Sequence, residues 1–122
     1  MSQLILIVDD NENNRKLARD VLEYACFSTV EATGGVEGIA MAMEHKPALV
    51  LMDIRMPDLS GTEALKLLRD DSRTAGIPIV ALTSSTMRGD EERFIAEGFD
   101  GYLAKPISVR EFPDQVREFL RE

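Results

Sequence analysis

The chain has 122 residues, of which 44% are hydrophobic and 30% charged, so it predicts one soluble globular domain and is too short for two ordinary ones. Its 22 acidic residues against 14 lysines and arginines give a formal net charge of −8 at pH 7. Because such a surface repels nucleic-acid phosphates and anionic lipids, we expect no direct binding to nucleic acid or to membranes. Cations and basic protein surfaces are the expected partners.

The single cysteine, Cys26, cannot form an internal disulfide, so the sequence gives no sign of an oxidising compartment. Cys26 lies in an apolar helical segment, where we expect it to be a small buried hydrophobic residue. No signal peptide is recognisable, and no apolar run approaches the length of a membrane span. We therefore expect a cytoplasmic protein.

Strand-like and helix-like segments alternate five times along the chain. The expected strands are Leu4–Val8, Ser28–Ala32, 48–52, Ile79–Thr83 and Gly101–Ala104. The first, third and fourth are apolar on both faces, which is typical of parallel strands covered by helices on both sides. The second and fifth are more mixed and suit the sheet edges. The pattern predicts a doubly wound α/β fold with right-handed crossovers.

Apolar residues at helical spacing mark the five intervening helices. The expected buried stripes are Leu17, Val21, Leu22 and Ala25; Val36, Ile39, Ala40 and Met43; Ala64, Leu65, Leu67 and Leu68; Phe94 and Ile95, with Phe99 beyond the turn; and Val116, Phe119 and Leu120. Ser108 and Glu111 fit a capping box for the last helix. Pro113 follows closely and should cost a helical hydrogen bond, so we expect this helix to start irregularly.

Polar residues stand where the predicted strands end, and ligands of open α/β sheets bind at that edge. They are Asp9 and Asp10 after the first strand, Asp53 after the third, Thr83 and Ser84 at the end of the fourth, and Lys105 after the fifth. Alone, each acid would be read as a cap or turn residue, Thr83 as a cap and Lys105 as a solvated surface residue. Their coincidence at four strand ends favours a functional site.

Three converging carboxylates repel one another, and a hard divalent cation relieves that repulsion. Mg²⁺ usually takes one or two protein carboxylates and keeps room for water and phosphate oxygens. A lysine and a hydroxyl in the same cavity would neutralise and hydrogen-bond a phosphoryl group, and a remaining carboxylate could act as a nucleophile. The expected chemistry is phosphoryl transfer with Mg²⁺ as cofactor.

Four motifs in this order resemble the receiver domain of bacterial two-component response regulators, over essentially the whole chain. The motifs are Asp9-Asp10, the segment 53–61 with the acceptor pattern D-x-x-M-P-x-x-x-G, Leu82-Thr83-Ser84, and Lys105-Pro106. Segments 87–93 and 105–109 are similar to single-domain regulators of the DivK type, although similar strings occur in the receivers of hybrid kinases.

The resemblance implies a flavodoxin-like sheet of five parallel strands in the order 2-1-3-4-5 with five helices, and one receiver domain over residues 1–122 with no output domain. It implies a signalling phospho-acceptor that catalyses only its own phosphorylation and dephosphorylation. The expected donor is a sensor histidine kinase or a histidine phosphotransfer protein, because His45, the only histidine, is a poor candidate donor. A downstream protein would bind the face of the fourth helix, fifth strand and fifth helix, and the chain would be a monomer or weak dimer.

The resemblance also assigns roles to single residues. Asp53 would accept the phosphoryl group, and Thr83, Ser84 and Lys105 would contact it. Asp9, Asp10, Asp53 and the backbone carbonyl of Arg55 would hold Mg²⁺. Tyr102 would be the switch aromatic residue that turns inward as Thr83 moves, or else simply a packed edge-strand residue. Arg55 and Ser85 occupy positions that tune hydrolysis of the acyl phosphate.

Four alternatives are compatible with parts of this pattern. The chain could be a receiver excised from a hybrid kinase or a multidomain regulator. A phosphatase of the haloacid-dehalogenase type also uses an aspartyl phosphate, but it needs an acid two residues after the nucleophile, where this chain has Arg55. A nucleotide-binding fold lacks its glycine-rich motif here, since Gly34-Gly35 does not fit one. A receiver fold that binds partners without phosphorylation would not need the full set of acids, hydroxyl and lysine.

Overall fold

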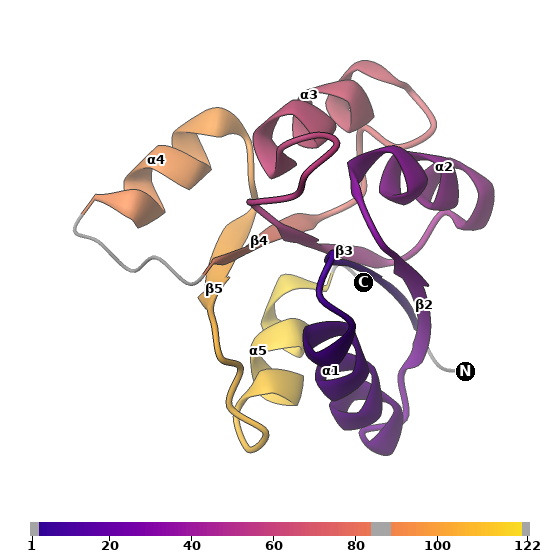
Figure 1. The fold of residues 1–122 in the computed structure, drawn as a ribbon, viewed down its shortest axis with the longest axis vertical. Coiled ribbons are helices and arrows are strands. Elements are labelled where there is room, and N and C mark those ends of the chain that lie inside the picture. Colours follow the sequence, from indigo (N-terminus) through magenta and orange to yellow (C-terminus); the bar gives the residue numbers. More distant parts are fainter. Residues whose placement is uncertain (1–2, 84–88, 121–122) are drawn as a thin grey trace.

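The computed structural model describes residues 3–83 and 89–120, and in this part of the chain five parallel strands form one sheet (Figure 1). The strands are β1 (Leu4–Val8), β2 (Ser28–Ala32), β3 (Leu49–Asp53), β4 (Ile79–Thr83) and β5 (Gly101–Ala104), in the order β2-β1-β3-β4-β5. The predicted doubly wound fold and its strand order are confirmed, with β2 and β5 at the edges.

Helices cover both faces of the sheet, as Figure 1 shows. The helices are α1 (Glu12–Tyr24), α2 (Gly35–His45), α3 (Gly61–Asp70), α4 (Asp90–Glu97) and α5 (Phe112–Phe119). α1 and α5 lie on one face, and α2, α3 and α4 lie on the other. Among the described residues, none of these helices has both the length and the apolar composition that crossing a bilayer would require.

Two apolar clusters, one on each face, hold the layers together. Alternate residues of β1 enter opposite clusters: Ile5 and Ile7 pack towards Leu22 of α1, whereas Leu6 and Val8 pack on the face of α2 and α3. β3 and β4 are buried at every position, because helices cover both sides of them. Burial on both faces explains why these strands could be recognised from their continuous apolar runs.

The third strand differs from its prediction by one residue. The expected range was 48–52, but β3 runs from Leu49 to Asp53, and Asp53 pairs with Leu82 of β4. Asp53 is therefore the last residue of the strand and does not follow it. A carboxylate at this position is held by the sheet ladder itself, which fixes its direction more firmly than a loop would.

Several of the predicted helix stripes were partly wrong. In α2 the buried residues are Gly35, Gly38 and Ala42, whereas Val36 is 64% exposed. Gly38 faces the sheet because a Cβ there would lie 2.9 Å from both methyl groups of Val8. The backbone of α2 therefore packs closely on the sheet at Gly38, in place of the contacts of larger apolar side chains that were predicted. Four further stripe residues are also on the exposed side of their helices: Leu17, Ala40, Leu67 and Ile95.

Cys26 is exposed, so its prediction as a buried hydrophobic residue was wrong. α1 ends at Tyr24, and Cys26 follows it with a φ of 73°, in the left-handed region. Its backbone N–H donates to the carbonyl oxygen of Glu23. The residue therefore belongs to the turn that ends the helix, whereas the neighbouring Phe27 is buried.

The last helix starts later than the predicted capping box implies, and its start is regular. Ser108 opens a turn, and its hydroxyl accepts the N–H of Glu111 at 3.4 Å, but α5 begins only at Phe112. Pro113 occupies the first turn of the helix, where a backbone N–H has no helical acceptor, so it costs no helical hydrogen bond. A reciprocal capping box does exist, at Ser60 and Glu63 of α3, where it was not predicted.

At the edge of the sheet where the strands begin, Arg69 joins three segments. Its guanidinium donates to the carbonyl oxygens of Ala75, Ile77 and Gly98 and to Asp100 Oδ2, the last at 2.7 Å. The same Asp100 oxygen accepts the N–H of Ile79 at 2.7 Å. One arginine of α3 thus satisfies backbone groups of the segment before β4 and of the segment before β5.

Candidate functional site

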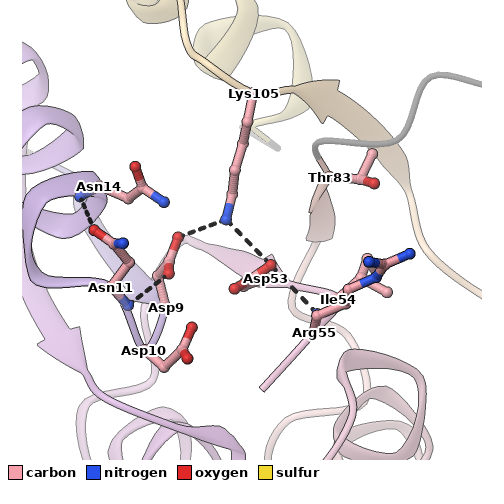
Figure 2. A pocket seen from close by; sticks show the side chains of 9 residues that line it. All are labelled: Asp9, Asp10, Asn11, Asn14, Asp53, Ile54, Arg55, Thr83 and Lys105. Carbon is pink, nitrogen blue, oxygen red and sulfur yellow. Dashed lines mark hydrogen bonds and ion pairs between the residues drawn. The ribbon is translucent and has the colours of Figure 1, made fainter. Parts of the chain in front are cut away.

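The opposite edge of the sheet, where the strands end, holds a polar cavity of about 180 Å³ (Figure 2). Residues from four strand ends line this cavity, as expected for an open parallel sheet. Six of the residues singled out from the sequence line it, namely Asp9, Asp10, Asp53, Arg55, Thr83 and Lys105. Asn11, Asn14 and Ile54 complete the lining.

Lys105 links two carboxylates from different strands. Its ammonium lies 2.9 Å from Asp9 Oδ2 and 3.1 Å from Asp53 Oδ1 (Figure 2). Asp9 and Asp53 are buried, with exposed fractions of 1% and 7%, so their ion pairs with Lys105 are partly shielded from water. The backbone N–H of Lys105 donates to the backbone carbonyl oxygen of Thr83 at 2.7 Å, and this bond joins the end of β5 to the end of β4.

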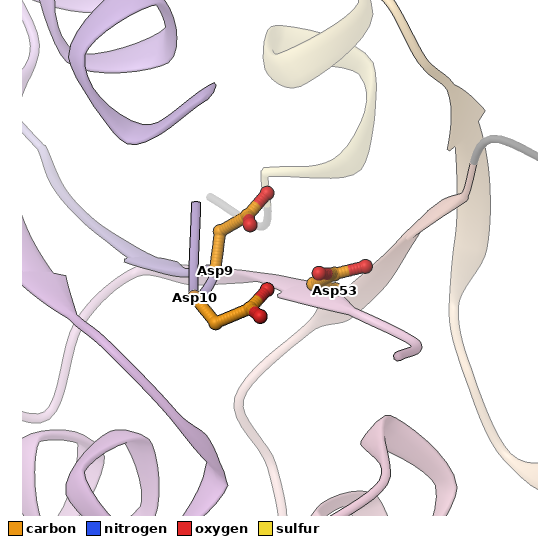
Figure 3. A group of neighbouring side chains, drawn as sticks. All are labelled: Asp9, Asp10 and Asp53. Atoms are coloured by element: carbon orange, nitrogen blue, oxygen red, sulfur yellow. The ribbon is translucent and has the colours of Figure 1, made fainter. Parts of the chain in front are cut away.

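The carboxylates of Asp9, Asp10 and Asp53 gather at one point, as Figure 3 shows. One oxygen from each lies within 4.8 Å of the others. Apart from its ion pair with Lys105, the buried Asp9 Oδ2 accepts no hydrogen bond among the described residues. Asp10, in contrast, is exposed.

This donor set fits a small hard cation. Mg²⁺ prefers oxygen ligands at about 2.1 Å, so its ligand atoms lie at most about 4.2 Å apart. The three oxygens lie within 4.8 Å of one another, which is close to that limit, and the exposed Asp10 side chain can adjust to complete the set. The carbonyl oxygen of Arg55, expected as a further ligand, belongs to a residue that lines the same cavity.

Burial and the neighbouring carboxylate of Asp9 raise the pKa of Asp53 to about 6, although Lys105 and the N–H of Arg55 act in the opposite direction. Burial opposes the charge of Lys105 as well, but the two carboxylates beside it outweigh burial and raise the pKa of the lysine. Near neutral pH the cavity therefore holds a charged lysine between two carboxylates.

The raised pKa of Asp53 predicts how its contribution to stability depends on pH. Since the pKa is 3.8 without the fold and about 6 within it, the folded protein binds the extra proton between these values, and ionised Asp53 destabilises the fold above about pH 6. The free energy of unfolding of metal-free Asp53→Asn should therefore exceed that of the wild type by ~1–2 kcal/mol at pH 7, less than the full value of the shift because the cavity is open to water.

Denaturant titrations of both proteins at pH 4 and pH 7, in EDTA, measure this difference. At pH 4 the two proteins should differ much less, because Asp53 is then neutral in the folded protein and only about half ionised in the unfolded chain, so little of the penalty has developed. Titration of groups remote from Asp53 is common to the two proteins and cancels. A difference that is as large at pH 4 as at pH 7 would contradict the electrostatic cause.

The start of α1 holds the adjacent acids Asp9 and Asp10 in place. The N–H of Asn11 donates to Asp9 Oδ1 at 2.9 Å, and the side-chain oxygen of Asn11 caps α1 by accepting the N–H of Asn14 at 3.0 Å. The cap of this helix is therefore Asn11 and neither of the two aspartates. A signal for it was present, since Asn is a favoured N-cap residue, but the sequence analysis did not assign it.

The loop after Asp53 is fastened at two points. The N–H of Gly61 donates to the carbonyl oxygen of Ile54 at 2.9 Å. Asp58 accepts the N–H groups of Gly35 and Val36, each at 3.1 Å, and these bonds hold the pKa of Asp58 below its usual value. The loop thus caps α2 and cannot move independently of it. No structural role was predicted for Asp58 from the sequence, because its hydrogen-bond partners lie more than twenty residues away along the chain.

The receiver-domain family of response regulators matches residues 5–117 of the chain. The chain belongs to the response regulator receiver domain family. The polar-differentiation response regulator DivK of Brucella anthropi is 42% identical over 120 residues, with 98% of each chain covered. Receiver domains are signalling domains of two-component systems rather than classical enzymes, so the comparisons do not favour the phosphatase and nucleotide-binding alternatives.

Solved receiver structures agree with the fold. The chemotaxis response regulator CheY4 of Vibrio cholerae superposes with a TM-score of 0.91 at 27% identity, over 98% of this chain and 100% of that chain. The receiver domain of the sensor histidine kinase PA1611 of Pseudomonas aeruginosa has a TM-score of 0.88 at 28% identity, covers 98% of both chains, and carries a magnesium ion coordinated in its active site cleft.

Of the predicted site residues, Tyr102 lies away from the described lining of the cavity. Tyr102 of β5 is half-buried on the α4 side, where its ring centroid lies 6.2 Å from that of Phe94. It is not among the described residues that line the cavity. Ser84 lies outside the described residues, as does Ser85.

Proposed function

We propose that this receiver accepts a phosphoryl group on Asp53 from the phosphohistidine of a sensor histidine kinase or a histidine phosphotransfer protein. Mg²⁺ would be held by Asp9, Asp10, Asp53 and the carbonyl oxygen of Arg55. Phosphorylation would change how a downstream protein binds the face formed by α4, β5 and α5. The observation that carries the proposal is the Lys105 ammonium 3.1 Å from Asp53 in a cluster of three carboxylates.

The residues of the chain divide the chemistry among them. A carboxylate oxygen of Asp53 attacks phosphorus, the new O–P bond forms as the N–P bond to imidazole breaks, and the imidazole nitrogen keeps the bonding electrons and takes a proton from water. Lys105 neutralises charge on the phosphoryl oxygens at the site of transfer. When bound, Mg²⁺ supplies further positive charge at the same oxygens.

The choice of Asp53 as the nucleophile rests on its surroundings. Asp9 is more deeply buried and is already engaged by both Lys105 and the N–H of Asn11. Asp10 is exposed and has no comparable cationic neighbour among the contacts described. Asp53 stands in the middle of the edge of the sheet, at the end of β3, where its Oδ1 lies 3.1 Å from the Lys105 ammonium and accepts the backbone N–H of Arg55 at 3.3 Å.

Intact-mass measurement after incubation with acetyl phosphate and Mg²⁺ tests the proposal. We expect a mass increase of one phosphoryl group, which is absent when EDTA replaces Mg²⁺, and peptide mapping should locate it on the peptide that contains Asp53. A stable adduct on another residue, or labelling that does not depend on the metal, would contradict the proposed acceptor or the proposed cofactor.

The proposed switch predicts that Thr83→Ala is phosphorylated but responds weakly. Thr83 is buried at the end of β4, and without its hydroxyl the phosphoryl group loses the hydrogen bond that would draw this strand end inward. In ring-proton NMR spectra, phosphorylation should shift the Tyr102 signals of the wild type and of the control Thr83→Ser, but those of Thr83→Ala only slightly. Tyr24, which is 92% exposed, is an internal reference. Equal Tyr102 shifts in all three proteins would remove Thr83 from the switch.

A further inference from the structure

Arg15 reaches from the first turn of α1 back to the backbone that carries the two neighbouring acids. Its Nη1 donates to the main-chain carbonyl oxygen of Asp9 at 2.7 Å, and its Nε lies 3.3 Å from Glu31 Oε1 of β2. Only 13% of the Arg15 side chain is exposed, so both contacts are shielded from water. Arg15 does not line the cavity, and the proposed phosphoryl chemistry gives it no role.

The carbonyl group that Arg15 binds belongs to the peptide joining Asp9 to Asp10. A peptide unit is planar, so fixing its carbonyl oxygen also fixes the direction in which the next residue, Asp10, leaves the plane. The N–H of Asp9 is held separately, by the carbonyl oxygen of Ala32 at 3.1 Å. With both of these bonds in place, the exposed Asp10 side chain starts from a fixed point beside the buried carboxylate of Asp9.

Glu31 keeps the guanidinium of Arg15 in place. Its two carboxylate oxygens are divided between two arginines of α1, with Oε1 at 3.3 Å from Arg15 and Oε2 at 3.1 Å from Arg19. Arg19 is more exposed, at 35%, and its described contacts are with Glu31 and Asp20, not with the backbone of the acid pair. The two arginines therefore share a partner, but only Arg15 touches Asp9.

We propose that Arg15 is a positioning residue for the metal site, oriented by Glu31. It holds the peptide between Asp9 and Asp10 so that both carboxylates are directed at one cation, and it is not itself a ligand. This inference rests on the proposed function, since it assumes that the acids bind Mg²⁺. Outer-shell partners that orient metal ligands typically contribute 10–100-fold to metal affinity.

The test compares Arg15→Gln with the matched control Arg19→Gln by calorimetric titration of the full chain with Mg²⁺. Both variants lose one positive charge and one ion pair with Glu31. Loss of a nearby positive charge by itself should strengthen Mg²⁺ binding in both. Loss of the carbonyl contact should instead weaken binding by about tenfold in Arg15→Gln alone, while Arg19→Gln stays within about twofold of the wild type.

Glu31→Gln provides a second variant that keeps Arg15 but removes its carboxylate partner. We expect Mg²⁺ binding about threefold weaker than in the wild type, between the two arginine variants. The inference would be overturned if Arg15→Gln bound Mg²⁺ as tightly as the wild type or more tightly. If Arg15→Gln does not fold, unchanged Mg²⁺ binding in Glu31→Gln would overturn it instead. A wild-type protein that binds no Mg²⁺ would overturn the proposed function itself, so the two failures are distinguishable.

Discussion

Asp53→Asn is expected to be folded but no longer phosphorylated by acetyl phosphate, with the labelling rate lowered at least ~100-fold because the attacking carboxylate oxygen is gone. Asparagine has nearly the shape of aspartate, so the end of β3 should keep its place. An amide is a poor nucleophile. The neighbouring carboxylate of Asp9 cannot take over the role of the Asp53 carboxylate, because it is buried and already contacts Lys105 and the N–H of Asn11.

The matched control is Asp70→Asn, a change of the same kind at an exposed residue at the end of α3. This control should be labelled at the rate of the wild type. Circular dichroism and denaturant titration would establish that both variants are folded. An Asp53→Asn protein that still gains one phosphoryl group per molecule, at a rate comparable with that of the control, would show that another residue is the acceptor.

Gly61→Ala is expected to lower the free energy of unfolding by roughly 3 kcal/mol, towards the upper end of the usual cost of overpacking. A Cβ at this position would lie 2.6 Å from the carbonyl oxygen of Asp53 and 3.0 Å from Cα of Ile54. Both are main-chain atoms, so no side-chain rotation can relieve the clash. Either α3 or the end of β3 must move, and Asp53 is the last residue of β3.

Thermal unfolding should show a melting temperature roughly 10 °C below that of the wild type, and labelling by acetyl phosphate should be slower as well. Gly76→Ala is the matched control, because nothing lies within 4 Å of the position a Cβ would take there. That variant should be neutral or more stable by up to ~1 kcal/mol, since alanine restricts the unfolded chain. Equal melting temperatures for the two variants would contradict the packing argument.

The glycine at the end of the acceptor pattern thus has a physical reason that the pattern alone does not reveal. From the sequence, Gly61 was only the last position of D-x-x-M-P-x-x-x-G. Its close approach to Asp53 depends on where α3 begins, which Ser60 and Glu63 set through their capping box. Contacts between backbone segments of this kind leave no periodic signal in the sequence.

Strands and strand ends were the most predictable parts of the molecule. β1 and β4 were recognised with their observed bounds because both faces of each are apolar, and the gathering of Asp9, Asp53 and Lys105 followed from parallel strands ending at one edge. The roles of these residues in phosphoryl transfer remain predictions. Helix faces were less predictable, because α2 buries Gly35 and Gly38 while exposing Val36.

The contacts that hold the site in place were not predictable in the same way. Arg15 and Asp58 have partners that can be identified only once the chain is folded, because their side chains bond to backbone groups. In the sequence alone, these two residues cannot be distinguished from ordinary charged surface residues. Local propensity and hydrophobic spacing therefore predicted which polar groups meet in the cavity but not the residues that hold them in place.

The contacts of Arg69 separate the molecule into two ends with different tolerance of mutation. This guanidinium and Asp100 hold the beginning of β4, at the far edge of the sheet from Asp53. Substitutions at that end should reduce the cellular abundance of the protein without touching the cavity, whereas substitutions among the acids change the charge of the cavity itself. The two edges of the sheet can therefore be altered separately, so members of a family can differ in how long they persist in the cell while keeping the same acids.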